Sequence, residues 1–220
     1  KNGIINFIKK KSFFIDCSSI DYKTTIKVSN EFAKKGIKFF DAPVSGGVSG
    51  AKNASLTIMV GGSKNSYTHV KKILNTLGKN IIYVGKSGSG QIVKACNNMM
   101  LGINMIGVSE AFTLANHYGI NSKTFFDVTS KSTGSSWAML NHLPIKGIVK
   151  TSAANNKYKP GYSANLILKD LSIARDMAKK VSLKALMGSK AFEIYTSFCK
   201  KNKSNLDYSA IIQSLFKSRK

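Results

Sequence analysis

The sequence is poor in arginine and acidic residues, although it is strongly basic overall. Of its 34 basic residues only Arg175 and Arg219 are arginines, and the rest are lysines spread along the chain. Recognition of phosphates and bases favours the planar guanidinium of arginine over the lysine ammonium. We therefore interpret the net charge of +24 as a lysine-rich solvated surface, and we expect no nucleic-acid partner.

Long apolar runs and a secretory leader are also lacking. Lys, Asn, Ser or Glu interrupts every apolar run before it reaches membrane-spanning length, and neither end has the layout of a signal peptide. We therefore expect no membrane partner. With 43% hydrophobic residues in 220, the chain is long enough to bury a sizeable core.

Cysteine is scarce and its spacing is uninformative. Cys17, Cys96 and Cys199 are odd in number, far apart and surrounded by apolar residues. This pattern favours reduced, buried thiols over disulfides or a metal site. The three histidines have no metal-ligand spacing either, so we predict no metal centre.

The pattern of apolar residues divides the chain near residue 86. Strand patterns cover 13–16, 37–44, 56–60 and 81–84, and helix patterns cover 21–35 and 65–77. Helix patterns alone follow, at 88–119, from 122, from 163 to 181, at 184–200 and at 207–217. Residues 1–12 resemble the last turns of an amphipathic helix. We predict an α/β domain at 1–86 and an all-helical domain at 87–220.

A single lysine stands out in the long helix pattern from Gly88 to Gly119. Lys94 lies among apolar residues, and Asn98 follows four positions later on the same helix face. An amine in apolar surroundings favours its neutral form and can exchange a proton near neutral pH. The alternatives are a lysine whose amine reaches water and an asparagine that binds a neighbouring loop. We interpret Gly88-Ser89-Gly90 as a flexible hinge.

Two further sets of residues are weaker candidates. Ser45, Gly46 and Gly47 follow a strand and are typical of a backbone cradle for an anion, although an ordinary tight turn has the same composition. Lys169 and Asp176 share a helix face, which is more often a solvated face than a site. No G-x-G-x-x-G follows a first strand, so the phosphate-binding half of a dinucleotide fold is not found here.

Four motifs in this order resemble one enzyme family. They are DAPVSGGV at 41–48, LTIMVGG at 56–62, GSGQIVKACNNM at 88–99 and LKDL at 168–171. Together they are similar to the β-hydroxyacid dehydrogenases, most closely to the 3-hydroxyisobutyrate dehydrogenase branch. The resemblance extends over essentially the whole chain. It implies the C-terminal part of a Rossmann-like dinucleotide-binding domain followed by an all-α domain like that of 6-phosphogluconate dehydrogenase.

The resemblance also implies a reaction and a set of roles. The expected reaction is oxidation of 3-hydroxyisobutyrate to methylmalonate semialdehyde by NAD, a step of valine breakdown. Lys94 matches the catalytic lysine that takes the hydroxyl proton. Asn98 matches a substrate-positioning asparagine, and Ser45, Gly46 and Gly47 match the turn that holds the substrate carboxylate.

Two residues match cofactor-contacting positions of the family, Ser19 after the first strand and Lys169 in the LKDL motif. Tyr162 stands where the family usually has Phe, and Asp176 matches a supporting aspartate. The chain starts where relatives are already well into the cofactor domain, which marks it as N-terminally truncated. We therefore expect the 220 residues alone to bind NAD poorly and to be inactive.

The resemblance leaves other questions open. Superfamily relatives with the same lysine and turn act on tartronate semialdehyde, glyoxylate or succinic semialdehyde, and a choice between NAD and NADP needs the segment that is missing. A basic helical interaction or nucleic-acid-binding module is the non-enzyme alternative. For assembly, the resemblance implies a homodimer or homotetramer. For compartment, it implies a mitochondrial location, with a cytoplasmic one as the alternative.

Overall fold

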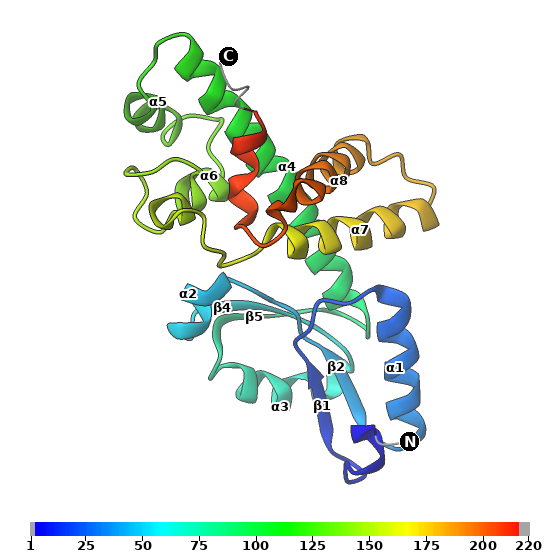
Figure 1. Ribbon diagram of the computed structural model, residues 1–220. Coiled ribbons are helices and arrows are strands. Elements are labelled where there is room, and N and C mark those ends of the chain that lie inside the picture. The colour runs from blue at the N-terminus through cyan, green and yellow to red at the C-terminus, as the bar shows by residue number, and fades with distance from the viewer. Residues whose placement is uncertain (1–2, 216–220) are drawn as a thin grey trace. The chain divides into compact units, whose positions relative to one another are not determined.

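The structure is a computed structural model that describes residues 3–215. It divides into two compact units, residues 1–97 and 98–220, which are described separately below. Figure 1 shows strands in the first unit and helices alone in the second. The expected α/β domain followed by a helical domain is confirmed, while the boundary near residue 86 stays a prediction.

Five strands form the sheet of the first unit. They are β1 (Phe13–Asp16), β2 (Lys38–Asp41), β3 (Val44–Ser45), β4 (Leu56–Gly61) and β5 (Gly78–Gly85). The pairs β1–β2 and β4–β5 are parallel, whereas β4 is antiparallel to β2 and β3. The strand predicted at 37–44 is wrong in its continuity, because Ala42-Pro43 separates β2 from β3. Proline has no N–H to donate to a sheet ladder.

Helices cover both faces of this sheet. Successive residues of a strand point to opposite faces, so apolar side chains on both faces need a covering layer. Figure 1 shows α1 (Tyr22–Lys34) and α3 (Lys64–Leu74) on either side of the strands. Phe39 of β2 packs with the α1 residue Phe32, and its neighbour Phe40 packs with Val70 and Leu74 of α3. The predicted cap of α1 is confirmed, since the Asp21 carboxylate accepts a hydrogen bond from the Thr24 N–H at 2.9 Å.

The second unit is built from helices around one main core. They are α4 (Ser89–His117), which begins in the first unit, α5 (Ser122–Thr129), α6 (Trp137–His142), α7 (Ala164–Lys180) and α8 (Leu186–Phe198). Ile167 and Leu171 of α7 pack with Tyr195 and Phe198 of α8 in the largest buried cluster. Among the residues that the structure describes, no helix is both long and apolar enough to cross a membrane.

Some local predictions were wrong. Of the predicted helix end at 1–12, the described residues 3–12 contain only a 3-10 turn, Ile4–Asn6. The last predicted helix is a 3-10 segment, Tyr208–Ser214, and its predicted end at 217 lies outside the described residues. The short helix α2 (Gly47–Lys52) was not predicted. Helix α4 is buried on one face and exposes apolar residues elsewhere. The cysteines are free but not buried, since Cys17 and Cys96 are exposed.

Candidate functional site

The predicted anion turn, Ser45, Gly46 and Gly47, joins β3 to α2. Gly46 and Gly47 have φ angles of 132° and 62°, which L side chains rarely adopt. Both glycines are exposed, and Ser45 is half-buried. The glycines therefore turn the chain sharply and leave backbone N–H groups accessible next to a hydroxyl, which is a fitting arrangement for a small carboxylate.

A buried carboxylate holds the start of α4. Asp41 is fully buried, and its two oxygens accept hydrogen bonds from the N–H groups of Gly88 at 2.7 Å and Gln91 at 3.1 Å. Burial raises the pKa of Asp41, and these backbone hydrogen bonds lower it in part. These bonds hold the start of α4 in this structure, and the role of Gly88-Ser89-Gly90 as a hinge stays a prediction. Its glycines make room, because a Cβ on Gly90 would lie 2.5 Å from the Met59 carbonyl oxygen.

One side chain of α4 fixes the loop that carries Ser19. Gln91 is 2% exposed, its Oε1 accepts from the Ile20 N–H at 3.2 Å, and its Nε2 donates to the Ser18 carbonyl at 2.7 Å. Ser19 is therefore held from both sides at the carboxyl end of β1. Lys94 lies three residues after Gln91 on the same helix and is half-buried rather than fully buried.

The second unit places a buried polar cluster around Asn98, which is 2% exposed. Its Nδ2 donates to Asp170 Oδ2 at 2.6 Å and to the Tyr162 hydroxyl oxygen at 3.3 Å. The Tyr162 hydroxyl donates in turn to the same Asp170 oxygen. Lys169 Nζ forms an ion pair with the other oxygen, Oδ1, at 2.9 Å. Asn98 and Lys169, which were predicted separately, thus meet at one carboxylate.

The charge of Asp170 and burial keep Tyr162 protonated. Burial raises the pKa of the Tyr162 hydroxyl far above its ordinary value, and the neighbouring Asp170 carboxylate raises it further. Tyr162 therefore acts as a hydrogen-bond donor throughout the physiological pH range. Its lone pair still accepts the weaker bond from Asn98.

Sequence reasoning missed Asp41, Gln91 and Asp170. Asp176, taken from the resemblance as a supporting aspartate, is 57% exposed and lies 3.5 Å from Arg175. Asp170 is the buried one, at 4% exposure. A signal was present, because Asp170 falls on the apolar stripe of α7, between residues 167 and 171 that form its core. A carboxylate on a buried stripe is rare unless it has partners.

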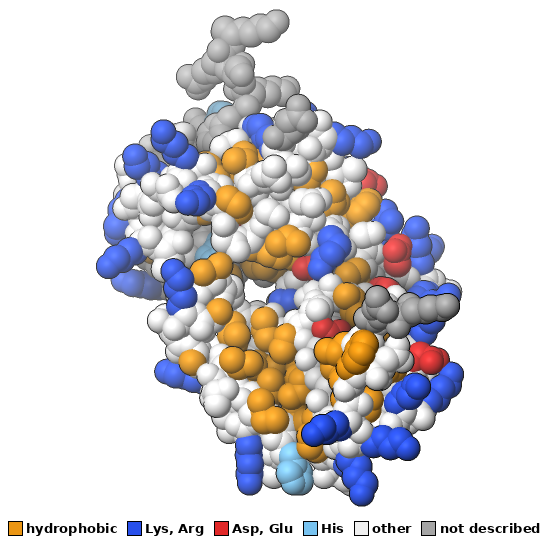
Figure 2. Space-filling model, turned by 60° about the horizontal axis from the view of Figure 1, so that its bottom comes forward, with side chains coloured by type: hydrophobic (Ala, Val, Ile, Leu, Met, Phe, Trp, Pro, Cys, Tyr) orange, Lys and Arg blue, Asp and Glu red, His pale blue; other side chains and the backbone are white. Residues whose placement is uncertain are grey.

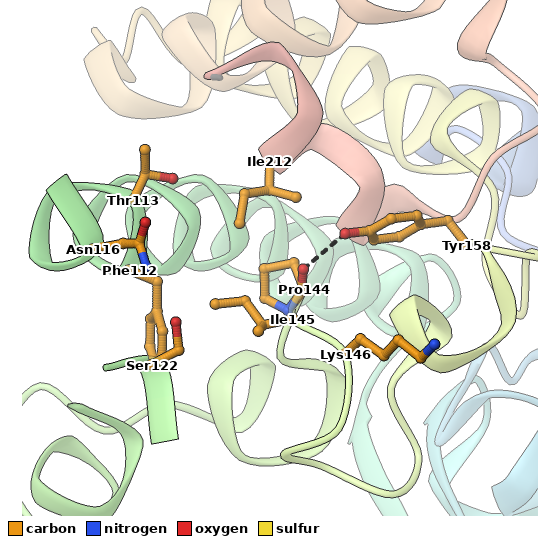
Figure 3. Close-up of a pocket in the computed structure, with 9 residues that line it drawn as sticks. All are labelled: Phe112, Thr113, Asn116, Ser122, Pro144, Ile145, Lys146, Tyr158 and Ile212. Atoms are coloured by element: carbon orange, nitrogen blue, oxygen red, sulfur yellow. Dashed lines mark hydrogen bonds between the residues drawn. The ribbon is translucent and has the colours of Figure 1, made fainter. Parts of the chain in front are cut away.

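A pocket of about 300 Å³ lies elsewhere in the helical unit (Figure 3). Phe112 and Asn116 of α4, Pro144 and Tyr158 are among its lining residues, and the Tyr158 hydroxyl donates to the Pro144 carbonyl at 2.8 Å. None of the predicted site residues lines it. The pocket therefore gives no support to the predicted catalytic roles.

Two family profiles match consecutive parts of the chain. Residues 1–85 match the NAD-binding domain of 6-phosphogluconate dehydrogenase. Residues 88–215 match the profile described as NAD-binding of NADP-dependent 3-hydroxyisobutyrate dehydrogenase.

Curated relatives and a solved structure are similar over nearly the same span. The mitochondrial 3-hydroxyisobutyrate dehydrogenase of Rattus norvegicus is 39% identical over 97% of this chain and 64% of its own length. A probable 3-hydroxyisobutyrate dehydrogenase of Mycobacterium bovis is 40% identical over 93% of this chain and 69% of its own. The Mycobacterium tuberculosis enzyme, solved with L-serine, superposes with a TM-score of 0.91 at 38% identity, over 97% of this chain and 73% of that one. The chain thus spans slightly less than two thirds of the rat protein.

Proposed function

Because the chain belongs to the β-hydroxyacid dehydrogenase family, we propose that the protein carrying it oxidises 3-hydroxyisobutyrate to methylmalonate semialdehyde with NAD, in valine breakdown. The observation that carries the proposal is the placement of Lys94 and Asn98 four residues apart in the continuous helix α4. A hydrogen bond from the Gly88 N–H to Asp41 fixes the start of the helix. A hydrogen bond to Asp170 fixes the Asn98 side chain itself.

Lys94 is the proposed general base. In the oxidation its neutral amine takes the proton of the substrate hydroxyl, and in the reverse direction its ammonium returns that proton. The turn at Ser45, Gly46 and Gly47 binds the substrate carboxylate through backbone N–H groups and the hydroxyl. Asn98 orients the substrate through its side-chain amide. L-serine, present in the Mycobacterium tuberculosis structure, is itself a 3-hydroxy acid, which supports this substrate class.

Ser19 and Lys169 are the proposed cofactor contacts. The Ser19 loop follows the carboxyl end of β1, where open parallel sheets bind dinucleotides. The Ser19 hydroxyl, in a loop whose flanking backbone groups bond to Gln91, suits a polar cofactor edge, and the Lys169 ammonium suits an anionic one. When bound there, NAD supplies the hydride acceptor. We also propose that the 220 residues alone bind NAD weakly and are inactive, because they contain no G-x-G-x-x-G sequence.

Replacement of Lys94 tests the proposed reaction. In the intact protein that carries this chain, Lys94→Ala should lower kcat with 3-hydroxyisobutyrate and NAD about 100-fold or more, the usual contribution of a general base. The control is Lys72→Ala, which removes an exposed lysine of α3 and should leave kcat unchanged. A fall in turnover of less than about tenfold, roughly 1.4 kcal/mol of barrier, would refute the role of Lys94.

The same assays separate the other substrates. Tartronate semialdehyde, glyoxylate and succinic semialdehyde are tested as reductions with NADH and NADPH, and the highest kcat/KM identifies the substrate and cofactor. The nucleic-acid reading has less support, because lysines are scattered over the visible face in Figure 2 rather than gathered in one patch. A steep loss of nucleic-acid affinity with increasing salt concentration would instead support a nucleic-acid-binding function.

Assembly and compartment are part of the proposal. Exposed apolar side chains at the turn between α7 and α8, including Val181, Leu186 and Met187, support a homodimer or homotetramer, which sedimentation measures directly. Relatives named as mitochondrial support a mitochondrial location, whereas bacterial relatives keep the cytoplasmic alternative open. Fractionation of cells that contain the protein distinguishes the two.

A further inference from the structure

The strand end that carries Asp41 leads directly to the turn that is proposed to bind the substrate carboxylate. Asp41 is the last residue of β2, and Ser45, which begins the turn, is the last residue of β3. Both strands pair with β4 of the same sheet, Asp41 opposite Gly61 and Ser45 opposite Thr57. The backbone of the turn is therefore held in register with the backbone of Asp41.

The side chain of the same residue holds the start of α4. The Asp41 oxygens accept hydrogen bonds from the N–H groups of Gly88 and Gln91, and bonds of this kind to a charged group are about twice as strong as neutral ones. Backbone also packs directly on the carboxylate, because a Cβ on Gly61 would lie 2.6 Å from Oδ1 and one on Gly90 would lie 2.8 Å from Oδ2. Strand and helix thus meet at this carboxylate with no side chain between them.

Lys94 lies three residues after Gln91 in the continuous helix α4. A displacement of the helix start therefore carries the backbone of Lys94 with it. Asp41, the turn and Lys94 all belong to the first compact unit of the chain. Asp41 is thus linked to both parts of the proposed substrate site, through its backbone to the turn and through its side chain to the helix of Lys94.

We propose that Asp41 is a positioning residue, which fixes the distance between the turn at residues 45–47 and the backbone of Lys94. The inference rests on the proposed function, in which the turn holds the substrate carboxylate and Lys94 takes the hydroxyl proton. Both groups belong to one small substrate, so their binding partners must keep a fixed spacing. A misplacement of about 1 Å can cost about 100-fold in rate. Asp41 is fully buried and acts on the reaction through Lys94.

The test begins with a measurement that needs no turnover. Asp41→Asn keeps the size of the side chain but replaces one acceptor oxygen with an NH2 group, which faces a backbone N–H. In the 220-residue chain, the amides of Gly88 and Gln91 should both exchange with water faster, by about tenfold for the one that faces the new NH2 group. Glu31→Gln is the control, because it removes the same charge from an exposed position of α1, and it should leave both amides unchanged. Unchanged exchange in Asp41→Asn overturns the inference, whatever the activity of the protein.

Kinetics of the intact protein test whether Asp41 acts through Lys94. Asp41→Asn should lower kcat for the hydroxy acid about tenfold with a smaller change in KM, because the substrate carboxylate still binds the turn. In a Lys94→Ala background the same substitution should cause no further loss, since no amine is left to position. A further loss in that background would show a general structural role and overturn the inference.

A second variant displaces the helix start and leaves Asp41 intact. The Cβ of Gly90→Ala would lie 2.5 Å from the Met59 carbonyl oxygen, so this variant should also lower kcat. Gly107→Ala lies in the same helix with no atom within 4 Å of its Cβ, and it should leave kcat unchanged. An unchanged kcat in a folded Gly90→Ala protein overturns the inference. Faster amide exchange in Asp41→Asn, together with a wild type that turns over no hydroxy acid, supports the placement of α4 by Asp41 and overturns the proposed function instead.

Discussion

Gln91 offers a sharp test of how the first unit positions Ser19. Its side chain makes two hydrogen bonds to the loop, from the Ile20 N–H and to the Ser18 carbonyl. Gln91→Met removes both bonds but keeps the length and volume of the side chain. Methionine and glutamine have similar helix propensities, so α4 itself should be unaffected. The variant therefore isolates the two hydrogen bonds.

The expected effect follows from the number of bonds lost. Each hydrogen bond contributes about 1 kcal/mol net, so opening of the Ser18–Ile20 loop should become easier by about 2 kcal/mol. That corresponds to an increase of about 30-fold in the open population. The packing loss is small, because volume-conserving substitutions usually cost less than about 1.5 kcal/mol.

Amide hydrogen exchange measures this opening at Ile20. In Gln91→Met the Ile20 amide should exchange about 30-fold faster than in the wild type. Trp137, the sole tryptophan, lies in the helical unit, so its fluorescence reports whether that unit is unaffected. The matched control is Gln213→Met, which removes a bond to Lys203 in the second unit. Equal Ile20 exchange in Gln91→Met and the wild type would refute the reasoning.

Two further predictions concern stability. Gly61→Ala would place a Cβ 2.6 Å from Asp41 Oδ1 and 2.9 Å from the Gly90 nitrogen. This variant should lower the free energy of unfolding, measured by urea titration, by about 2 kcal/mol or more. Gly107→Ala is the control, because its Cβ would have no atom within 4 Å, and it should raise the free energy of unfolding by about 0.5–1 kcal/mol. Equal effects of the two substitutions would contradict the crowding argument. Burial lowers the pKa of His142 below its ordinary 6.5, and Asp207 opposes this with a smaller effect. Below about pH 6.5 the unfolded chain therefore binds a proton that the folded chain does not. The free energy of unfolding should fall there as the pH drops, by at most about 1.4 kcal/mol per pH unit from this group. His142→Gln should flatten that part of the pH profile, and an unchanged profile would exclude His142 as its source.

Much of the local structure was predictable from the sequence. Strand β1 and helix α1 have the bounds that apolar periodicity and the Asp21 cap indicate, because both signals are local. The break at Pro43 and the short helix α2 were missed, since a short segment rich in glycine has no periodicity to detect. The motifs around Lys94, Asn98 and Ser45 were visible as residues in order, and their catalytic roles stay predictions.

Only the tertiary structure decided how these residues are held. Asp41 and Gly88 are 47 positions apart, Ser18 and Gln91 are 73 apart, and Asn98 and Asp170 are 72 apart. No local pattern specifies such pairs, because a buried polar group is satisfied by whichever partner the fold brings near it. The sequence by itself determined the order of strands and helices and the candidate residues. Folding determined that Asp41, Gln91 and Asp170 are the buried groups that fix the candidate residues and the loops that carry them.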